Sequence, residues 1–524
     1  MERSEHTYNS LMSMENLTGL TEEEALDYIG RLIDVSLDLR KREGIERAIK
    51  LSRELQERQL TAGQLATSHY FLANAWTNHR TLLRADSDRS WEWEQEEIEK
   101  EIIHLRKALH EDGIKELPDE RVCQILTNLG NVMNHVGRFV EAIEYWDKAL
   151  AKLPSFPMAH GNRGLSLTSY AHALYDRGHA AILLRYAYID LSKALFFPIH
   201  DDARKGFEKC LRKIESILLS EFLDKETDMD TFSLGASNQE IRYRQWCLRN
   251  RLFLNPLNDL GPYSISARDI LSTPDIVVEI AEGPYYPGYF NQMKQEYVSA
   301  RYIYYEGINA DQPHFSDKDV LLYNTLDYPS YSLAVEKMKI AFRITYSLFD
   351  KIAYFLDHYF HLSIPEKRVS FRTFWYKSQE KKNGLRKDFQ QRQNWPFRGL
   401  FWLSKDLYED KPGFRESIEP EAKELNEIRN HLEHKYLKVH EDLWSGPPSK
   451  DDKISRALAD TLAFSLYRHN FQEKTLRLMK IARAALLYLS LAIHSEEQRR
   501  AKGKSPESMI IGIPLDIWED HWKV

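Results

Sequence analysis

The chain has 524 residues, 43% of them hydrophobic, and a formal net charge of −7 at neutral pH. This length exceeds what one hydrophobic core usually supports, so it predicts two to four domains. The composition excludes an extensively disordered chain. The acidic balance argues against a constitutive, nonspecific nucleic-acid binder, although a local basic surface would still permit specific binding.

Neither end of the chain predicts a membrane or export segment. The first residues lack the basic start and apolar core of a signal peptide. The longest apolar stretch, Ile481 to Ile493, is too short to cross a bilayer. We therefore expect a soluble, cytoplasmic protein.

The residue types that bind metals do not form a recognisable site. The cysteines lie far apart without a CxxC pair, which predicts core thiols rather than disulfides or zinc ligands: Cys123, Cys210 and Cys247. Two histidine pairs have metal-compatible spacing but lack a third ligand, namely His358 with His361 and His431 with His434. We predict no metal and no cofactor.

The first region in chain order contains an internal repeat. Between Leu126 and Pro154 the spacing of small, aromatic and apolar residues resembles the tetratricopeptide (TPR) pattern almost position by position. Gly130 and Ala142 fall where two antiparallel helices approach closely, and Gly137 breaks the chain between them. Pro154 ends the second helix.

Degenerate copies extend this resemblance over roughly residues 20 to 200. A stretched copy begins near Gly164 and ends at Pro198, and two worn copies precede the clear one. The resemblance implies stacked helix pairs whose concave surface holds a peptide or protein trigger. The alternative is a packing scaffold without a separate ligand.

Between about residues 222 and 330, proline and glycine interrupt short apolar runs, which predicts an irregular connecting region. A short strand is expected in such a region, for example Asp275 to Ile280. No P-loop, GxGxxG or nucleophile elbow occurs anywhere in the chain. The sequence therefore gives no support to an ATPase, a dinucleotide-binding enzyme or an α/β-hydrolase.

A long helix is predicted from Ser332 to about Phe360, because apolar residues recur there at three- and four-residue intervals. A polar, basic interval follows. Further helices are predicted from near Pro420, from about Ile454 to His469, and from Asn470 to His494. Together they predict a four- or five-helix bundle.

The predicted fold class is therefore mostly α, in four segments. Helical repeats occupy residues 1–221, the connecting region 222–330, the bundle 331–495 and a tail 496–524. The apolar residues from Ile510 to Val524 are expected to dock on the bundle or on a second copy of the chain.

One helix of the bundle has a face that carries candidate chemistry. Its apolar residues share a side with a period of 3.6, namely Leu425, Ile428, Leu432, Tyr436 and Val439. At about 100° per residue, Arg429 lies at the edge of that side and Glu433 lies further round. Asn430 and His434 lie opposite, so the polar residues form a band that faces away from the core.

The sequence Arg429-Asn430-x-x-x-His434 resembles the Arg-polar-x(3 to 5)-His signature of the HEPN superfamily. The resemblance covers about residues 332 to 494. It implies a metal-independent ribonuclease that dimerises through its motif helices. It also implies a role as a toxin or in antiviral defence, and TPR-fused bacterial members fit the layout of this chain.

The motif residues suit RNA cleavage without a metal. This reaction needs a base for the ribose 2′-OH, an acid for the 5′-oxygen and positive charge for the phosphorane. A symmetric dimer would bring two copies of His434 and Arg429 into one cleft, with Asn430 orienting the phosphate or the imidazole. The expected products carry a 2′,3′-cyclic phosphate and a 5′-hydroxyl.

Two alternatives remain open from the sequence. In the first, Arg429 and Glu433 form an ordinary surface ion pair and His434 is a solvated helix residue. In the second, the protein is a non-catalytic adaptor whose repeats hold a protein partner, and whose bundle serves for dimerisation or nucleotide binding.

A basic segment between Lys367 and Arg398 interleaves cations with aromatic rings, which is typical of a single-stranded RNA surface. We predict RNA contacts, with tRNA as one candidate substrate, from Lys377, Lys381, Lys382, Arg386, Lys387, Arg392, Trp375 and Trp395. The alternative is that the rings belong to the core and the charges form a solvated rim.

Overall fold

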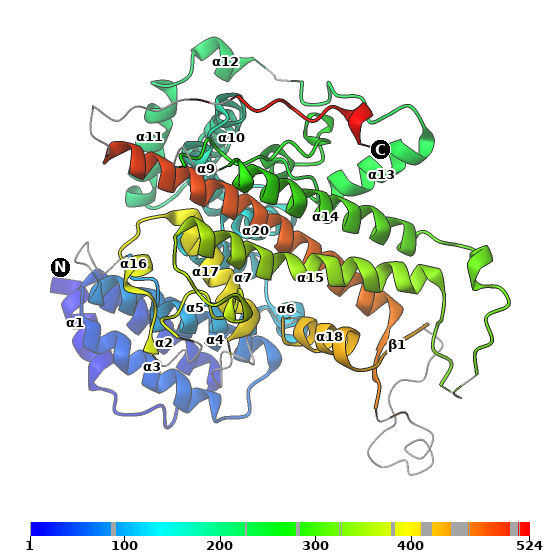
Figure 1. Cartoon of the computed structure of the whole chain (residues 1–524). Helices are drawn as coiled ribbons and strands as arrows, with labels where there is room; N and C mark the ends of the chain where they lie inside the picture. Colours follow the sequence, from blue (N-terminus) through cyan, green and yellow to red (C-terminus); the bar gives the residue numbers. More distant parts are fainter. Residues whose placement is uncertain are drawn as a thin grey trace.

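The computed structural model describes residues 2–84, 91–225, 228–278, 283–323, 325, 327–378, 383–409, 422–441, 460, 462–503, 512 and 514–523. The chain is mainly helical, which confirms the predicted fold class (Figure 1). Within the described ranges only two short strands occur, β1 and β2. No helix in those ranges combines the length and hydropathy that a membrane span requires.

The N-terminal half consists of consecutive helices joined by short connections. They are α1 (Glu2–Ser13), α2 (Glu22–Asp38), α3 (Arg42–Gln56), α4 (Ala62–Leu83), α5 (Glu96–Ala108), α6 (Glu111–Glu116), α7 (Asp119–His135), α8 (Phe139–Lys152), α9 (Pro157–Ala173), α10 (Arg177–Phe196), α11 (Asp201–Glu215) and α12 (Ser220–Asp224). Neighbours pack as pairs, most extensively α4 with α5, α7 with α8 and α9 with α10. This arrangement is consistent with helical repeats, and the TPR assignment itself stays a prediction.

Two glycines shape the α7–α8 hairpin as the sequence predicts. Gly130 faces the indole of Trp146 so closely that a Cβ atom would overlap the ring. Gly137 follows α7 with a φ of +87°, a left-handed conformation that glycine adopts without strain. A side chain at Gly137 would also collide with the backbone of Trp395 and Gly399. The turn is therefore pressed against the C-terminal half.

The C-terminal half is built around three long helices. Its elements are α13 (Asn238–Arg249), η2 (Pro256–Asp259), η3 (Ser264–Ser266), α14 (Tyr285–Ile308), η4 (Phe315–Asp317), α15 (Leu333–Tyr359), η5 (Glu366–Arg368), α16 (Lys387–Gln390), α17 (Trp395–Tyr408), α18 (Ala422–His434), β1 (Leu437–His440), β2 (Phe464–Tyr467), α20 (Arg468–Lys502) and η7 (Asp520–Trp522). Helices α14, α15 and α20 pack side by side, and α18 packs against α15 and α17 (Figure 1).

The helix predicted from Ser332 to Phe360 is confirmed as α15, and its apolar stripe is buried. Two other helix predictions are wrong at their ends. Helix α18 ends at His434, so Tyr436 and Val439 do not continue its apolar face. Residues 464–467 form β2 instead of the end of a helix, whereas residues 454–459 and 461 lie outside the described part.

A parallel pairing of β1 with β2 explains these differences. The register runs from Leu437 opposite Phe464 to His440 opposite Tyr467. Every residue of β1 is buried, including Lys438, whose ammonium contacts Asp327 at 2.7 Å. The ladder with β2 supplies hydrogen-bond partners for the buried backbone of β1, and Asp327 supplies a partner for the buried ammonium of Lys438. These contacts favour the extended conformation over another helical turn.

The connecting region and the C-terminal tail differ in part from the structure that the sequence predicts. The segment predicted as irregular contains two regular helices, α13 and α14. Residues 275–278 have no regular secondary structure, which contradicts the expected strand in its described part. In the tail, Leu515, Ile517 and Trp518 are exposed rather than docked on the bundle. Docking on a second copy stays a prediction.

Helix α17 lies at the boundary between the two halves, a boundary that we call the seam. Residues Pro396 to Leu407 are buried, including two adjacent charges, Lys405 and Asp406. Asp406 accepts hydrogen bonds from both terminal nitrogens of Arg106 at 2.6 and 2.8 Å and from Arg138. Lys405 forms an ion pair with Glu99. All three partners belong to the N-terminal half.

We predict that Asp406→Asn lowers the free energy of unfolding by about 3–5 kcal/mol, because two buried guanidinium groups lose their carboxylate partner. Denaturant titration followed by circular dichroism measures this loss. The control Asp27→Asn removes an exposed i,i+4 partner of Arg31 and should change the stability by less than about 1 kcal/mol. Equal effects of the two substitutions would contradict the structural role of Asp406.

Candidate functional site

The motif residues lie on α18 as its periodicity predicts. Leu425 and Ile428 are fully buried and Leu432 is nearly so, which turns the other side of the helix outward. Arg429 and Asn430 are half-buried, and the amide oxygen of Asn430 accepts a hydrogen bond from Arg429 at 3.1 Å. His434, the last residue of the helix, is exposed.

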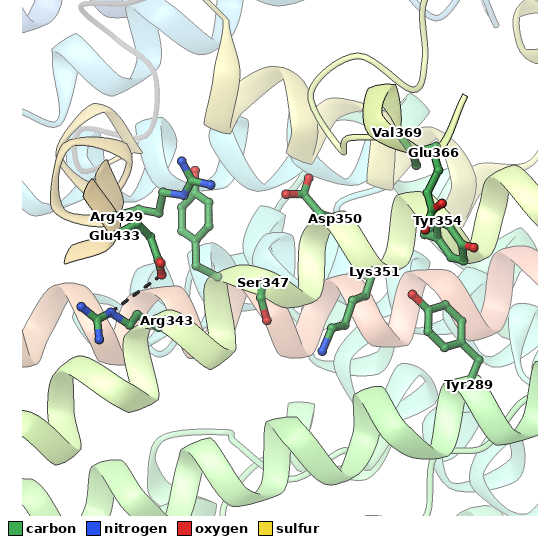
Figure 2. Close-up of a pocket in the computed structure, with 11 residues that line it drawn as sticks. Tyr289, Arg343, Ser347, Asp350, Lys351, Tyr354, Glu366, Val369, Arg429 and Glu433 are labelled. Carbon is green, nitrogen blue, oxygen red and sulfur yellow. Dashed lines mark ion pairs between the residues drawn. The ribbon is translucent and has the colours of Figure 1, made fainter. Parts of the chain in front are cut away.

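Arg429 lines a cleft of about 530 Å³ between α18, α15 and the segment around η5 (Figure 2). Tyr289 from α14 contributes to the far end of this cleft. The other lining residues are Arg343, Tyr346, Ser347, Asp350, Lys351, Tyr354, Glu366, Val369 and Glu433. The guanidinium of Arg429 lies 5.9 Å from the ring centroid of Tyr346, within cation–π range.

Glu433 forms its ion pair with Arg343, at 3.8 Å, and both side chains are about two-fifths exposed. Within the described ranges no ion pair joins Arg429 to Glu433. The surface ion pair that the sequence left open as an alternative is therefore not formed. Arg429 keeps N–H donors directed at the cleft without a carboxylate partner in the described part of the chain.

Burial and neighbouring charges shift the pKa values of several side chains that line the cleft. Desolvation raises the pKa of Asp350, and the N–H of Phe371 and the charge of Arg429 lower it in part. Burial raises the pKa of Tyr346 to about 12, and burial together with Tyr354 and Glu296 raises that of Tyr289 to about 12. Both phenols therefore stay protonated at neutral pH and remain hydrogen-bond donors.

The predicted RNA-contacting cations have different surroundings. Lys377 and Lys387 are exposed, as a phosphate contact requires. Arg386 donates to the carbonyl of Phe374 at 3.0 Å, and Arg392 forms an ion pair with Glu496. These two arginines are therefore held by intramolecular contacts. Lys381 and Lys382 lie outside the described residues.

The prediction that Trp375 stacks on RNA bases is wrong, whereas that for Trp395, which is only partly buried, stays a prediction. Trp375 is fully buried, and its indole nitrogen donates to the carbonyl of Phe371 at 2.8 Å. Trp395 stacks on Phe139 with the ring centroids 4.4 Å apart, and its indole nitrogen donates to the carbonyl of Asn134 at 2.6 Å. Trp375 belongs to the core, where burial of its indole removes apolar surface from water, and Trp395 packs against the core while part of its surface stays exposed.

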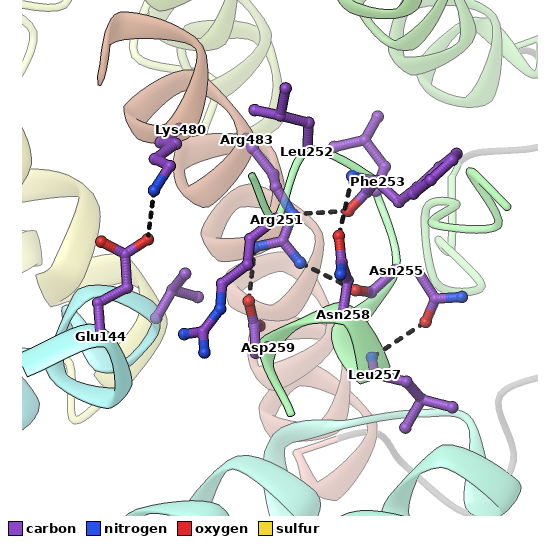
Figure 3. Close-up of polar contacts among 12 residues, drawn as sticks. Glu144, Arg251, Leu252, Phe253, Asn255, Leu257, Asn258, Asp259, Lys480 and Arg483 are labelled. Carbon is purple, nitrogen blue, oxygen red and sulfur yellow. Dashed lines mark hydrogen bonds and ion pairs between the residues drawn. The ribbon is translucent and has the colours of Figure 1, made fainter. Parts of the chain in front are cut away.

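A second charged cluster lies where α8 and η2 meet α20 (Figure 3). Arg483 forms an ion pair with Asp259 at 2.6 Å and also donates to two backbone carbonyls. Glu144 is the shared partner of Arg477 and Lys480, each at 3.6 Å, and Arg251 is bound to Asp147. The four cations outnumber the three carboxylates, and each carboxylate is paired with at least one cation, so the cluster joins α8, η2 and α20 by ion pairs.

No group of three or more His, Cys, Asp or Glu side chains within the described ranges is arranged to hold a metal ion. Two of the three cysteines, Cys123 and Cys247, are buried as predicted.

Residues 277–496 match a family model for a HEPN domain. The domain is of the LA2681-like HEPN type, and it contains the whole of α14, α15, α17 and α18 and most of α20. No curated protein and no solved structure matches the chain. Residues 277–496 thus carry a HEPN domain, which indicates a nuclease- or RNA-related function.

We predict that Trp375→Ala lowers the free energy of unfolding by about 3–5 kcal/mol, because it leaves a large cavity in the aromatic core. Lys387→Ala, in the same segment but exposed, should change stability by less than about 0.5 kcal/mol. Thermal and denaturant unfolding of both variants measures the difference. A stable Trp375→Ala protein would restore the surface interpretation of this segment.

Proposed function

We propose that this protein is a metal-independent endoribonuclease that leaves 2′,3′-cyclic phosphate and 5′-hydroxyl ends. The observation that supports it most strongly is the position of Arg429. Its guanidinium faces a cleft without a carboxylate partner in the described part of the chain, and His434 is exposed on the same helix. A phosphate-binding arginine and an accessible imidazole are the two groups that such cleavage requires.

The proposed reaction uses two copies of the chain. One His434 removes the proton from a ribose 2′-OH, and the 2′-oxygen attacks the adjacent phosphorus. Arg429 stabilises the charge on the phosphorane oxygens, and the second His434 protonates the departing 5′-oxygen. Asn430 acts as a positioning residue, because its amide oxygen holds Arg429 by a hydrogen bond.

We further propose that the protein acts as a toxin or anti-phage effector whose N-terminal half controls the nuclease. The seam supports this proposal, since Arg106 and Arg138 of that half bind Asp406 next to the bundle. A trigger that bound the helical repeats and altered this contact would change the geometry of the HEPN domain.

We predict that the purified protein cleaves tRNA or single-stranded RNA in EDTA, and that His434→Ala lowers the rate at least about 100-fold. Arg429→Ala should lower it comparably, because the phosphorane loses its cation. Gel analysis and determination of the 3′ ends measure both effects. His6→Ala, an exposed histidine on α1, serves as the matched control and should cleave like the wild type.

Equal cleavage by wild type and His434→Ala would indicate a contaminating nuclease or another site. Full biological activity of both the His434→Ala and the Arg429→Ala protein would favour the adaptor function, in which the domain binds a protein or nucleotide without catalysis.

We also predict that the active species is a dimer, with about twice the chain mass of 61.7 kDa. One chain supplies a single His434, whereas the proposed reaction needs both a base and an acid. Size-exclusion chromatography coupled to light scattering measures the mass under assay conditions. A strictly monomeric, fully active protein would exclude the composite site.

A further inference from the structure

The cleft extends well beyond Arg429 because one face of α15 lines it over three turns. Its residues there follow alternating spacings of three and one, which places them on a single side of the helix: Arg343, Tyr346, Ser347, Asp350, Lys351 and Tyr354. At about 1.5 Å per residue, this face is about 16 Å long. The buried apolar residues of α15 occupy the other side. The cleft is therefore an elongated trough (Figure 2).

The two ends of the trough differ in chemistry. At the α18 end, Arg429 and Arg343 present guanidinium groups. At the other end, Tyr289 and Tyr354 are half-buried and meet edge to face, with ring centroids 5.9 Å apart. The ring of Tyr354 also meets that of His358, with the centroids 4.8 Å apart, and it stays partly exposed where it lines the trough beside Glu366.

The rim beside the tyrosines is basic. Lys367 and Arg368 are exposed in η5, between Glu366 and Val369, which both line the trough. In the described ranges neither cation has a carboxylate partner. They belong to the basic segment recognised from the sequence, and they lie at the tyrosine end of the trough, opposite the motif helix α18.

The charges that line the trough are only partly paired, since Asp350 and Glu366 form no ion pair within the described residues. Glu433 is paired with Arg343, and Lys351 is paired with Glu296 of α14. The cations that remain without a carboxylate partner in the described part are Arg429, Lys367 and Arg368. An elongated ligand that carries negative charge near both ends and a flat group between them suits this distribution.

We propose that the trough binds a short single-stranded RNA segment that runs along α15. One unpaired base stacks on Tyr354, a phosphate lies at Arg429, and the strand leaves past Lys367 and Arg368. This assignment rests on the proposed ribonuclease function and deepens it by locating the substrate strand. RNA fits better than a peptide, because alternating phosphates and rings match the cations and tyrosines.

Binding is measured separately from cleavage. The full-length His434→Ala protein is titrated into a short, fluorescein-labelled single-stranded RNA in EDTA, and fluorescence anisotropy gives Kd. Introducing Tyr354→Ala into the His434→Ala protein should raise Kd roughly 5- to 100-fold, which is the effect expected for loss of one base–aromatic stack. Adding Tyr354→Phe keeps the ring and should leave Kd within about twofold.

The rim is tested by Arg368→Glu, an exposed substitution that leaves the core untouched. It should raise Kd and lower the slope of log Kd against log salt concentration, because a phosphate contact is lost. Tyr323→Ala is the matched control, since Tyr323 is 82% exposed and does not line the trough. Its Kd should equal that of the His434→Ala background. Circular dichroism melting curves verify that each variant is folded.

The outcomes separate this inference from the nuclease proposal. RNA binding that Tyr354→Ala and Arg368→Glu weaken, in a chain whose wild type never cleaves, would support the trough and overturn the ribonuclease. Cleavage that requires His434, with Kd unaffected by both substitutions, would overturn the trough alone. Failure of the His434→Ala protein to bind RNA, or preference for an acidic peptide at the same residues, would also overturn the RNA assignment.

Discussion

The fold depends on the neutralisation of two adjacent charges on α17. Lys405 and Asp406 are both almost completely buried, and a buried charge without a partner is strongly destabilising. Asp406 is paired with Arg106 and Arg138 of the N-terminal half, and Lys405 is paired with Glu99 of that half and with Glu409 of its own. The N-terminal half therefore supplies most of the charge that neutralises this part of α17.

The seam is also physically close to the trough. The hydroxyl of Ser404 on α17 donates to the carbonyl of Phe371 at 2.7 Å, and the N–H of Phe371 donates to Asp350 at 2.9 Å. Tyr408, at the end of α17, meets Tyr346 edge to face. These contacts connect α17 directly to residues beside Arg429. Coupling of this kind needs packed, hydrogen-bonded groups, and these are present.

The sequence predicts best where a repeated spacing identifies the buried side of a helix. The α7–α8 hairpin follows from Gly130, Gly137 and Pro154, and the outward side of α18 follows from Leu425 and its neighbours. These patterns depend only on residues close together in the chain, so local geometry suffices to interpret them.

Long-range contacts account for most of what the sequence does not predict. Trp375 is buried because Trp93, far away in the chain, packs against it with ring centroids 6.3 Å apart. Strand β1 forms because β2 lies beside it. The trough combines α14, α15, α18 and η5, and no spacing within one segment could indicate that these elements meet. The sequence identified the apolar stripe of α15 but not the polar residues on its other side that line the trough.

The close approach of Gly137 to Gly399 has an evolutionary consequence. A repeat array and the domain fused to it can be recombined between genes when each folds as an independent unit. Here a replacement array would have to supply a glycine turn where Gly137 meets Gly399 and an indole where Trp93 packs against Trp375. It would also need charges that pair with Lys405 and Asp406. An array that lacks any one of these features should therefore pack poorly against the C-terminal half, so this junction tolerates the exchange of a whole half less well than single substitutions elsewhere.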